Sequence, residues 1–402
     1  MRTPRIAATL VAVVALVVAS PALAAESVDD VLRAFATARG GLERWHAVQS
    51  LELTGRFESF SQEAPFSARW ARPDYFRFES LQQGAPYLLG RDAQGSWWQL
   101  KLYGHGWPRR TEGADDVQLA RAAELEPALL DAKAKGHQVE LLPHGEVDGK
   151  TTLALKLTRA DGSVETWHLD PATHLEVAVD SQIFDYTQTG DPVDRRTYFS
   201  DFRNVDGLQI PFRVDAEYKA RYTSLQVATA KVGGALPAET FRLPLSAGME
   251  ALRAWAGDWQ VKLEQQPNPR APWQAVEYTT TIEARDDGAL LVEKYRYEDP
   301  FQGPVRGERH LSWDRYHEIY RFTQYDPASG QIGILEGTMA DGVLLVSNEN
   351  TRSAVKSGET AILERYRSYE LGPDGWKTDG EVSTDGGKTW TLVAKMVYTR
   401  KR

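Results

Sequence analysis

Short runs in which apolar and polar residues alternate recur along most of the chain. Residues 75–79 and 152–157 are two such runs, and this period of two is typical of a strand with one buried face. Asp-Gly pairs stand between the runs, where glycine supplies the positive φ that a tight hairpin turn needs. The pairs begin at Asp148, Asp161, Asp206, Asp287, Asp341, Asp374 and Asp385. The pattern predicts an all-β chain whose antiparallel sheets curl into barrels or half-barrels.

Three stretches have helical periodicity instead. Residues 28–38 and 247–255 each place apolar side chains on one side of a helix, and residues 115–135 are rich in Ala, Leu and Glu. Pro127 should kink or restart the helix at 115–135, because proline lacks the N–H that a helix interior uses. We expect this helix to be a lid over a concave sheet.

Glycine and proline cluster at residues 233–237 and 243–245, after which a helix and a new set of hairpins begin. A length of 402 residues fits two domains, at about 150 residues each or somewhat more. The predicted division is a signal peptide at 1–25, a half-barrel domain at 26–246 and a barrel domain at 247–402.

The beginning of the chain has the form of a secretory signal peptide. Arg2 and Arg5 precede the apolar run 6–18, and small residues lead to a cleavage site near Ala24 or Ala25. The run is too short to span about 30 Å of hydrocarbon, and a chain without cysteine offers no lipid attachment site and no disulfide. We therefore expect a periplasmic protein that is not a lipoprotein and has no stable membrane insertion.

Charge narrows the possible partners. The net charge of −9 becomes −11 when the two arginines of the signal peptide are removed. An acidic protein without basic clusters is a poor candidate for binding nucleic acid or anionic lipid surfaces.

The usual catalytic signatures are incomplete in this sequence. There is no Gly-x-Ser-x-Gly elbow, and His317-Glu318 lacks the second histidine of a zinc-binding helix. Residues 145–151 are one residue short of a phosphate loop and lead into a strand. His168 and His174 flank a turn, where we interpret them as solvated or hydrogen-bonded strand residues. We therefore predict no catalytic residue, no metal and no cofactor.

Large apolar side chains at alternating positions of the first domain are candidates for lining an apolar cavity. A half-barrel of this size is not easily filled by its own side chains. A plainly packed core is the alternative, and most of the 12 tryptophans belong to it. The candidate ligand-binding residues are Trp70, Phe76, Phe78, Trp98, Leu100 and Trp167.

Most of residues 40–245 resembles exported bacterial proteins related to the outer-membrane lipoprotein carriers (LolA-like and LolB-like). The segments that carry the resemblance are 40–45, 50–55, 72–78, 198–202 and 205–211. The resemblance implies an incomplete antiparallel barrel around an apolar cavity, with helices as a lid. It also implies a ligand the size of an acyl chain.

Residues 252–259 and 383–400 resemble a bacterial domain family of unknown function that is related to calycin-type, lipocalin-like barrels. A Gly-x-Trp motif in the first strand and a basic residue in the last one are typical of that pattern. The resemblance implies that Gly257, Trp259 and Arg400 close one end of the barrel, with the arginine over the indole.

These patterns favour a non-catalytic periplasmic carrier or sensor. Its partner would be a lipid, the acyl chain of a lipoprotein or another apolar small molecule. Two other hypotheses stay open. One is an envelope hydrolase with a scattered active site, and the other is an interaction module that docks an envelope protein.

Overall fold

The structure is a computed structural model that describes residues 27–184, 192–267 and 270–401. It divides between Phe241 and Arg242 into two compact units, and each unit is described by itself. The predicted signal peptide, residues 1–25, lies outside the described residues.

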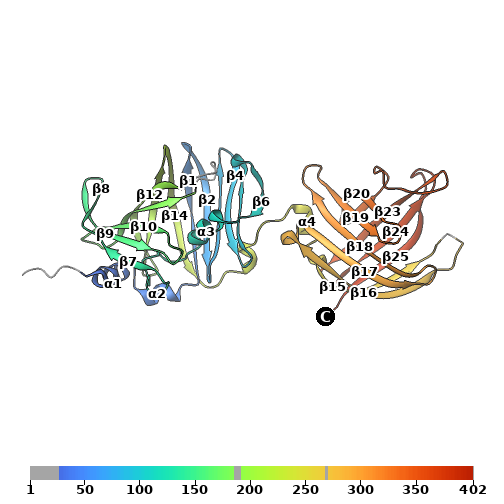
Figure 1. Ribbon diagram of the computed structural model, residues 1–402, viewed down its shortest axis with the longest axis horizontal. Coiled ribbons are helices and arrows are strands. Elements are labelled where there is room, and N and C mark those ends of the chain that lie inside the picture. Colours follow the sequence, from blue (N-terminus) through green and yellow to red (C-terminus); the bar gives the residue numbers. More distant parts are fainter. Residues whose placement is uncertain (1–26, 185–191, 268–269, 402) are drawn as a thin grey trace, which may run out of the picture. The chain divides into compact units, whose positions relative to one another are not determined.

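The first unit is built on one large, curved antiparallel sheet (Figure 1). Its strand order is β6-β5-β4-β3-β2-β1-β14-β13-β12-β11-β10-β9-β7, and β8 also pairs with β9. The pairing of β1 with β14 joins two series of hairpins, and β6 and β7 end the sheet, so it forms an open half-barrel. The strands are β1 (Ser50–Ser59), β2 (Gln62–Ala71), β3 (Tyr75–Gln82), β4 (Ala85–Asp92), β5 (Gly95–Leu100), β6 (His105–Arg110), β7 (Gln138–Leu141), β8 (Gly145–Val147), β9 (Lys150–Thr158), β10 (Val164–Leu169), β11 (Glu176–Ile183), β12 (Val193–Val205), β13 (Leu208–Tyr218) and β14 (Arg221–Gly233).

The second unit is a closed antiparallel barrel (Figure 1). Its strand order is β21-β20-β19-β18-β17-β16-β15-β25-β24-β23, and a further pairing of β21 with β23 closes the ring. The short strand β22 also pairs with β23. The strands are β15 (Gly257–Gln265), β16 (Gln274–Arg285), β17 (Leu290–Asp299), β18 (Gly303–Asp314), β19 (Ile319–Asp326), β20 (Gln331–Ala340), β21 (Val343–Ser347), β22 (Val355–Ser357), β23 (Thr360–Gly372), β24 (Gly375–Ser383) and β25 (Thr391–Arg400).

The predicted fold class is confirmed: a half-barrel sheet is followed by a closed barrel, and few residues are helical. Each of the seven Asp-Gly pairs named above joins two consecutive, paired strands, whereas an eighth pair, Asp379-Gly380, lies within β24. Gly207 at one of these turns has a φ of +84°, in the left-handed region that glycine adopts without steric cost.

The predicted helices are confirmed only in part. α1 (Val28–Ala38) has the expected bounds and buries Val31 and Phe35. The predicted helix at 115–135 is wrong in length, because α3 spans Ala114–Ala122. The other helices are α2 (Leu42–Ala47) and α4 (Ala247–Ala251), the latter followed by a 3₁₀ turn at Arg253–Trp255.

The chain leaves the helical conformation after Ala122 for local reasons. Pro127 cannot donate a helical hydrogen bond, and Asp131 has a φ of +51°, which no α-helix contains. The apolar residues that suggested a longer helix are buried in the core from a series of turns instead. They are Ala123, Leu125, Ala128, Leu129, Leu130 and Ala132.

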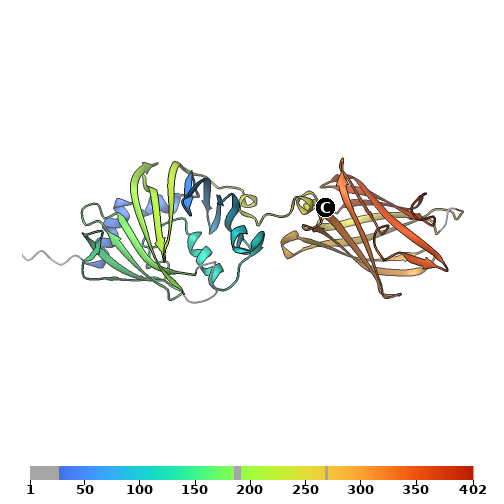
Figure 2. The ribbon, with the colours of Figure 1, turned by 90° about the horizontal axis from the view of Figure 1, so that it is seen from above.

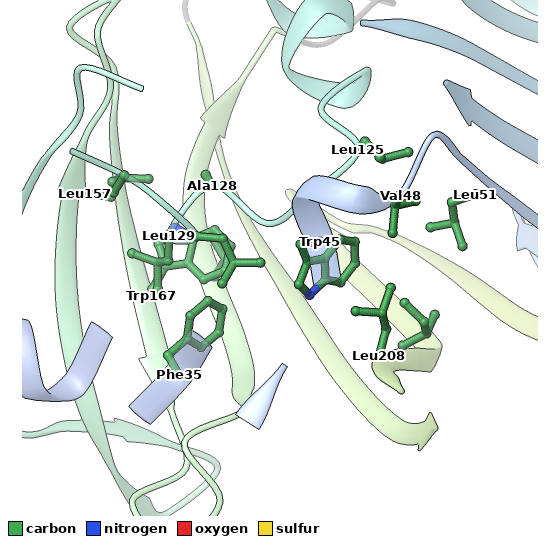
Figure 3. Packing of buried hydrophobic residues seen from close by; sticks show 14 of the residues in the cluster. Phe35, Trp45, Val48, Leu51, Leu125, Ala128, Leu129, Leu157, Trp167 and Leu208 are labelled. Atoms are coloured by element: carbon green, nitrogen blue, oxygen red, sulfur yellow. The ribbon is translucent and has the colours of Figure 1, made fainter. Parts of the chain in front are cut away.

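Helices α1 and α2 and this turn segment pack on the sheet through a dense apolar cluster (Figure 3). Phe35 meets Trp167 edge to face, with ring centroids 6.2 Å apart, a favoured aromatic geometry. The indole N–H of Trp45 donates to the carbonyl of Arg39 over 3.0 Å. Arg39 also forms a buried ion pair of 2.5 Å with Glu176, so losing either partner would leave an uncompensated charge in the core.

Gly257, Trp259 and Arg400 lie together in the barrel. Trp259 and Arg400 face each other across β15 and β25, and the guanidinium carbon lies 4.3 Å from the centroid of the indole. The same guanidinium donates to the carbonyls of Ala254 and Ala256. Gly257 has a φ of +135°, and a Cβ atom there would lie 2.5 Å from Nη1 of Arg400. Glycine therefore leaves the room that the guanidinium occupies.

Candidate ligand-binding cavity

The concave face of the half-barrel changes from apolar to polar along its strands. Because side chains alternate between the two faces, the register places those of one face in rows across the sheet. One row is apolar and consists of Phe57, Leu225, Val214 and Phe199. The next row consists of Ser59, Thr223, Ala216 and Thr197. The row beyond it consists of Arg221, Tyr218, Arg195 and Ser181.

A cavity of about 410 Å³ lies on this face, within the range of roughly 300–1,000 Å³ that ligand pockets span. Aromatic rings form part of its wall, since Phe57 lies 5.6 Å from Phe78 and 5.7 Å from Tyr87 between ring centroids. The apolar lining residues are Phe57, Phe76, Phe78, Leu89, Leu119, Ala122, Ile183, Val214, Ala216 and Leu225. The cavity thus offers a hydrocarbon surface that continues into a polar end.

Helix α3 lies on the concave side of the sheet (Figure 2), and its residues Leu119 and Ala122 line part of the cavity. Leu119 is its one buried side chain, at 1% exposure, and packs against Trp98 and Leu100 of β5. An isolated helix of nine residues is marginal in water, so α3 depends on this contact and on its polar contacts for its order.

Several polar contacts hold α3 in place. The backbone N–H of Phe184 donates to the side chain of Gln118 over 2.8 Å. Trp70 donates its indole N–H to the carbonyl of Ala122 over 2.8 Å. Each links the helix to a different strand region. These two contacts hold α3 at its middle, through Gln118, and at its last residue, Ala122.

A further contact is an ion pair of 2.7 Å between Arg121 of α3 and Asp161 in the β9–β10 turn. Partial burial alone would raise the pKa of Asp161, but hydrogen bonds from Ser163 and Arg121 lower it to about 2. The carboxylate stays charged at any ordinary pH, so this contact persists throughout that range.

The six residues predicted to bind the ligand share the concave face, but they do different things there. Phe76 and Phe78 line the cavity. Trp98 and Leu100 are buried beneath α3 and contact Leu119. They support the helix and do not border the cavity.

The other two predicted residues lie outside the cavity lining. Trp70 packs on Phe76, with ring centroids 5.3 Å apart, and holds the end of α3. Trp167 is buried against Phe35 and donates its indole N–H to Glu165 over 2.8 Å.

Several lining residues were missed in the sequence. Val214, Ala216 and Tyr218 alternate in β13 and line the cavity, so a period-two search of 212–218 could have found that strand. Gln82 and Thr197 carried no usable signal, because a polar residue in a strand ordinarily indicates a solvent-facing position.

The closed barrel contains a much smaller cavity of about 70 Å³, room for two or three water-sized groups at about 30 Å³ each. An ion pair of 3.2 Å between Glu293 and Arg309 lies on its wall. Burial by itself disfavours the charged guanidinium, but Glu293 holds the pKa of Arg309 well above its usual value. Burial, reinforced by Glu293, raises the pKa of Tyr398. Glu293, Arg309 and Tyr398 therefore satisfy one another on the wall of this small cavity.

Two of the histidines in strands have side-chain partners. His168 contacts Thr152 at 3.1 Å and Asp180 at 3.0 Å, and His310 contacts Glu308 at 2.5 Å. Within residues 27–184, 192–267 and 270–401, no group of three His, Asp or Glu side chains is arranged to hold a metal ion. Of the helices in these ranges, none has the length and apolar character that a membrane crossing requires.

Comparison with known proteins yields similar solved structures. No family model matches the chain, and no curated protein matches it. A LolA superfamily protein from Nitrosomonas europaea is 12% identical, covering 53% of this chain and 96% of that chain, with a TM-score of 0.37. A protein from M. tuberculosis is 17% identical and covers 40% of this chain and 100% of that chain, with a TM-score of 0.30. A DUF1329 family protein from Desulfovibrio piger is 14% identical and covers 54% and 97%, with a TM-score of 0.36.

The similar structures thus include the LolA superfamily, which the sequence resemblance predicts.

Proposed function

We propose that the chain is a carrier or sensor of the bacterial envelope that binds a lipid-like molecule in the half-barrel cavity without converting it. The observation that carries this proposal is the cavity of about 410 Å³ between an apolar concave face and the short helix α3. Its mechanism is burial, at about 0.8 kcal/mol for each methylene removed from water. Twelve methylenes contribute about 10 kcal/mol, which is comparable to the cost of association.

The signal peptide predicted at residues 1–25 supports action in the periplasm. In that compartment an apolar molecule must cross water between two membranes. A carrier shields it by enclosing the hydrocarbon, and α3 would open for loading and release.

Native mass spectrometry of the mature protein, purified from a bacterial periplasm, tests the proposal first. We expect a bound mass of lipid size that is lost on denaturation. Delipidated protein should then bind Nile red, a neutral apolar dye, with a fluorescence increase.

A pair of variants at adjacent positions makes this test specific to the cavity. Ala216 lines the cavity, whereas Glu217 points to the other face of β13 and is exposed. Ala216→Trp should weaken dye binding at least about tenfold by filling the cavity, and Glu217→Trp should leave it unchanged. Wild-type protein that carries no bound mass and binds no dye would rule the proposal out.

A further inference from the structure

We infer that one end of the half-barrel is a docking surface for a lipid bilayer, at which the cavity loads and releases its ligand. The partner is the neutral, zwitterionic surface of a membrane, and the contact is apolar and reversible. The inference goes beyond the proposed function and rests on it only for the ligand that is transferred.

The strand register defines two ends of the half-barrel. At one end, consecutive strands are joined by connections that the structure describes in full, and these are 60–61, 83–84, 101–104, 159–163 and 219–220. The cavity reaches this end, because four terminal residues of the strands there belong to its lining. They are Gln82 of β3, Ile183 of β11, Tyr218 of β13 and Arg221 of β14. We call it the cavity end.

Exposed apolar side chains of the half-barrel are concentrated at the cavity end. Among the described residues of this unit, eight large apolar side chains are exposed. Six of them lie in a connection at the cavity end, or at or next to the terminal residue of a strand there. These six are Phe60, Leu81, Leu102, Val164, Phe184 and Tyr222. At the opposite end no such side chain lies in the described connections, which are 72–74, 93–94, 148–149, 170–175 and 206–207.

Phe60 also occupies a backbone position that disfavours a large side chain. It forms the two-residue turn between β1 and β2 together with Ser61, and the two residues have φ of +53° and +57°. Positive φ at both positions, as in a type I′ turn, favours asparagine and glycine, and it is unusual for a bulky residue. The ring lies 5.8 Å from the guanidinium carbon of Arg221, yet it stays 41% exposed. Burial within the chain therefore does not offset the cost of this conformation, which points to a role outside the fold.

A bilayer fits this arrangement better than a protein partner does. The six side chains come from separate connections and strand ends, whereas a partner that adds a strand or a helix needs one continuous edge or groove. A ligand that is held by burial also dissolves in the hydrocarbon of a bilayer, so docking at the cavity end lets it pass between the two without crossing water. The net charge of −9 gives no attraction to anionic lipid. The contact is therefore apolar.

Co-sedimentation of the mature protein with phosphatidylcholine vesicles tests the docking surface. We expect the wild type to bind the vesicles equally well at low and at high salt, because apolar contacts are not screened. Phe60→Asn/Leu81→Thr should weaken this binding by about tenfold or more, from the loss of two apolar side chains that are nearly half exposed. Asparagine suits the turn and threonine suits a strand, so the variant keeps its fold.

The barrel supplies a matched control. Phe301 and Leu345 are 40% and 41% exposed, against 41% and 45% for Phe60 and Leu81. Phe301→Asn/Leu345→Thr removes the same kinds of side chain and should leave vesicle binding unchanged. An equal loss in this control, or vesicle binding that high salt abolishes, would overturn the inference.

Nile red binding without vesicles separates this inference from the proposed function. Neither Phe60 nor Leu81 lines the cavity, so Phe60→Asn/Leu81→Thr should bind the dye as the wild type does. Wild-type protein that binds the dye but no vesicles would overturn the docking surface alone. Vesicle binding without dye binding would overturn the proposed function and leave the docking surface in place.

The remaining outcomes concern a different occupant and a folding defect. Sedimentation velocity that shows a dimer of the wild type, lost in Phe60→Asn/Leu81→Thr, without any vesicle binding would assign the cavity end to a second copy of the chain and overturn the inference. If circular dichroism shows that the double variant is unfolded, Phe60→Asn and Leu81→Thr decide as single variants.

Discussion

Leu119→Ala removes the one buried side chain of α3 and tests whether this helix controls access to the cavity. Leu119 packs against Trp98 and Leu100, a contact that exists only while the helix is closed. The substitution keeps helix propensity, because alanine is the best helix former. It therefore weakens the attachment of α3 without weakening the helix itself.

The magnitude follows from the size of the truncation. Three buried carbons are lost, at about 0.8 kcal/mol each, which gives about 2.4 kcal/mol and agrees with the range of about 2–5 kcal/mol for Leu→Ala in a core. At 1.4 kcal/mol for each factor of ten, the open fraction of α3 rises about fiftyfold. If the ligand leaves only through the open form, its dissociation rate rises by the same factor.

Stopped-flow release of Nile red into detergent measures that rate. Val117→Ala is the matched control, because Val117 lies on the same helix but is 40% exposed, and it should leave the rate within twofold of wild type. An unchanged rate in Leu119→Ala, together with a lowered melting temperature, would refute the reasoning, since the contact would then stabilise the fold without gating the cavity.

Three further predictions concern stability. The pKa of Asp161 is lowered to about 2, so its ion pair stabilises α3 above pH 4 and is lost as the pH falls from 4 through 2; the hydrogen-exchange protection factors of the α3 amides, which correct for the intrinsic exchange rate at each pH, should be the same at pH 7 and pH 5 and fall only below pH 4. Arg400→Ala removes the cation–π contact with Trp259 and should lower the free energy of unfolding in urea by about 1–2 kcal/mol, whereas no loss would mean that the contact is not stabilising. Arg309→Met leaves the carboxylate of Glu293 buried without its partner and should cost about 3–5 kcal/mol, with Glu293→Gln/Arg309→Met recovering part of the loss in the same calorimetric scan.

The strands and their turns could be predicted from the sequence because both depend on neighbouring residues. Alternation over 75–79 reports that one side of a strand is buried, and Asp-Gly at Asp206 selects a hairpin turn through glycine's freedom at positive φ. The bounds of α1 could be read for the same reason, since Val31 and Phe35 form one apolar stripe.

From the sequence, the candidate site could be predicted only as one face of the half-barrel sheet. Alternation placed Phe76, Phe78, Trp98 and Trp167 on the concave side, yet it could not tell an open wall from a packed one. That difference arises from what lies opposite each side chain. Phe78 faces the cavity, whereas α3 covers Trp98.

Sequence alone thus determined the elements, the hairpins and the two-part β architecture, because these follow from local steric and periodic preferences. Only the tertiary structure decided that β1 pairs with the distant β14 and that Gln82 and Thr197 line one cavity. These outcomes depend on contacts between residues more than a hundred positions apart, and their energies compete across the whole fold. No short window of sequence contains both partners of such a contact.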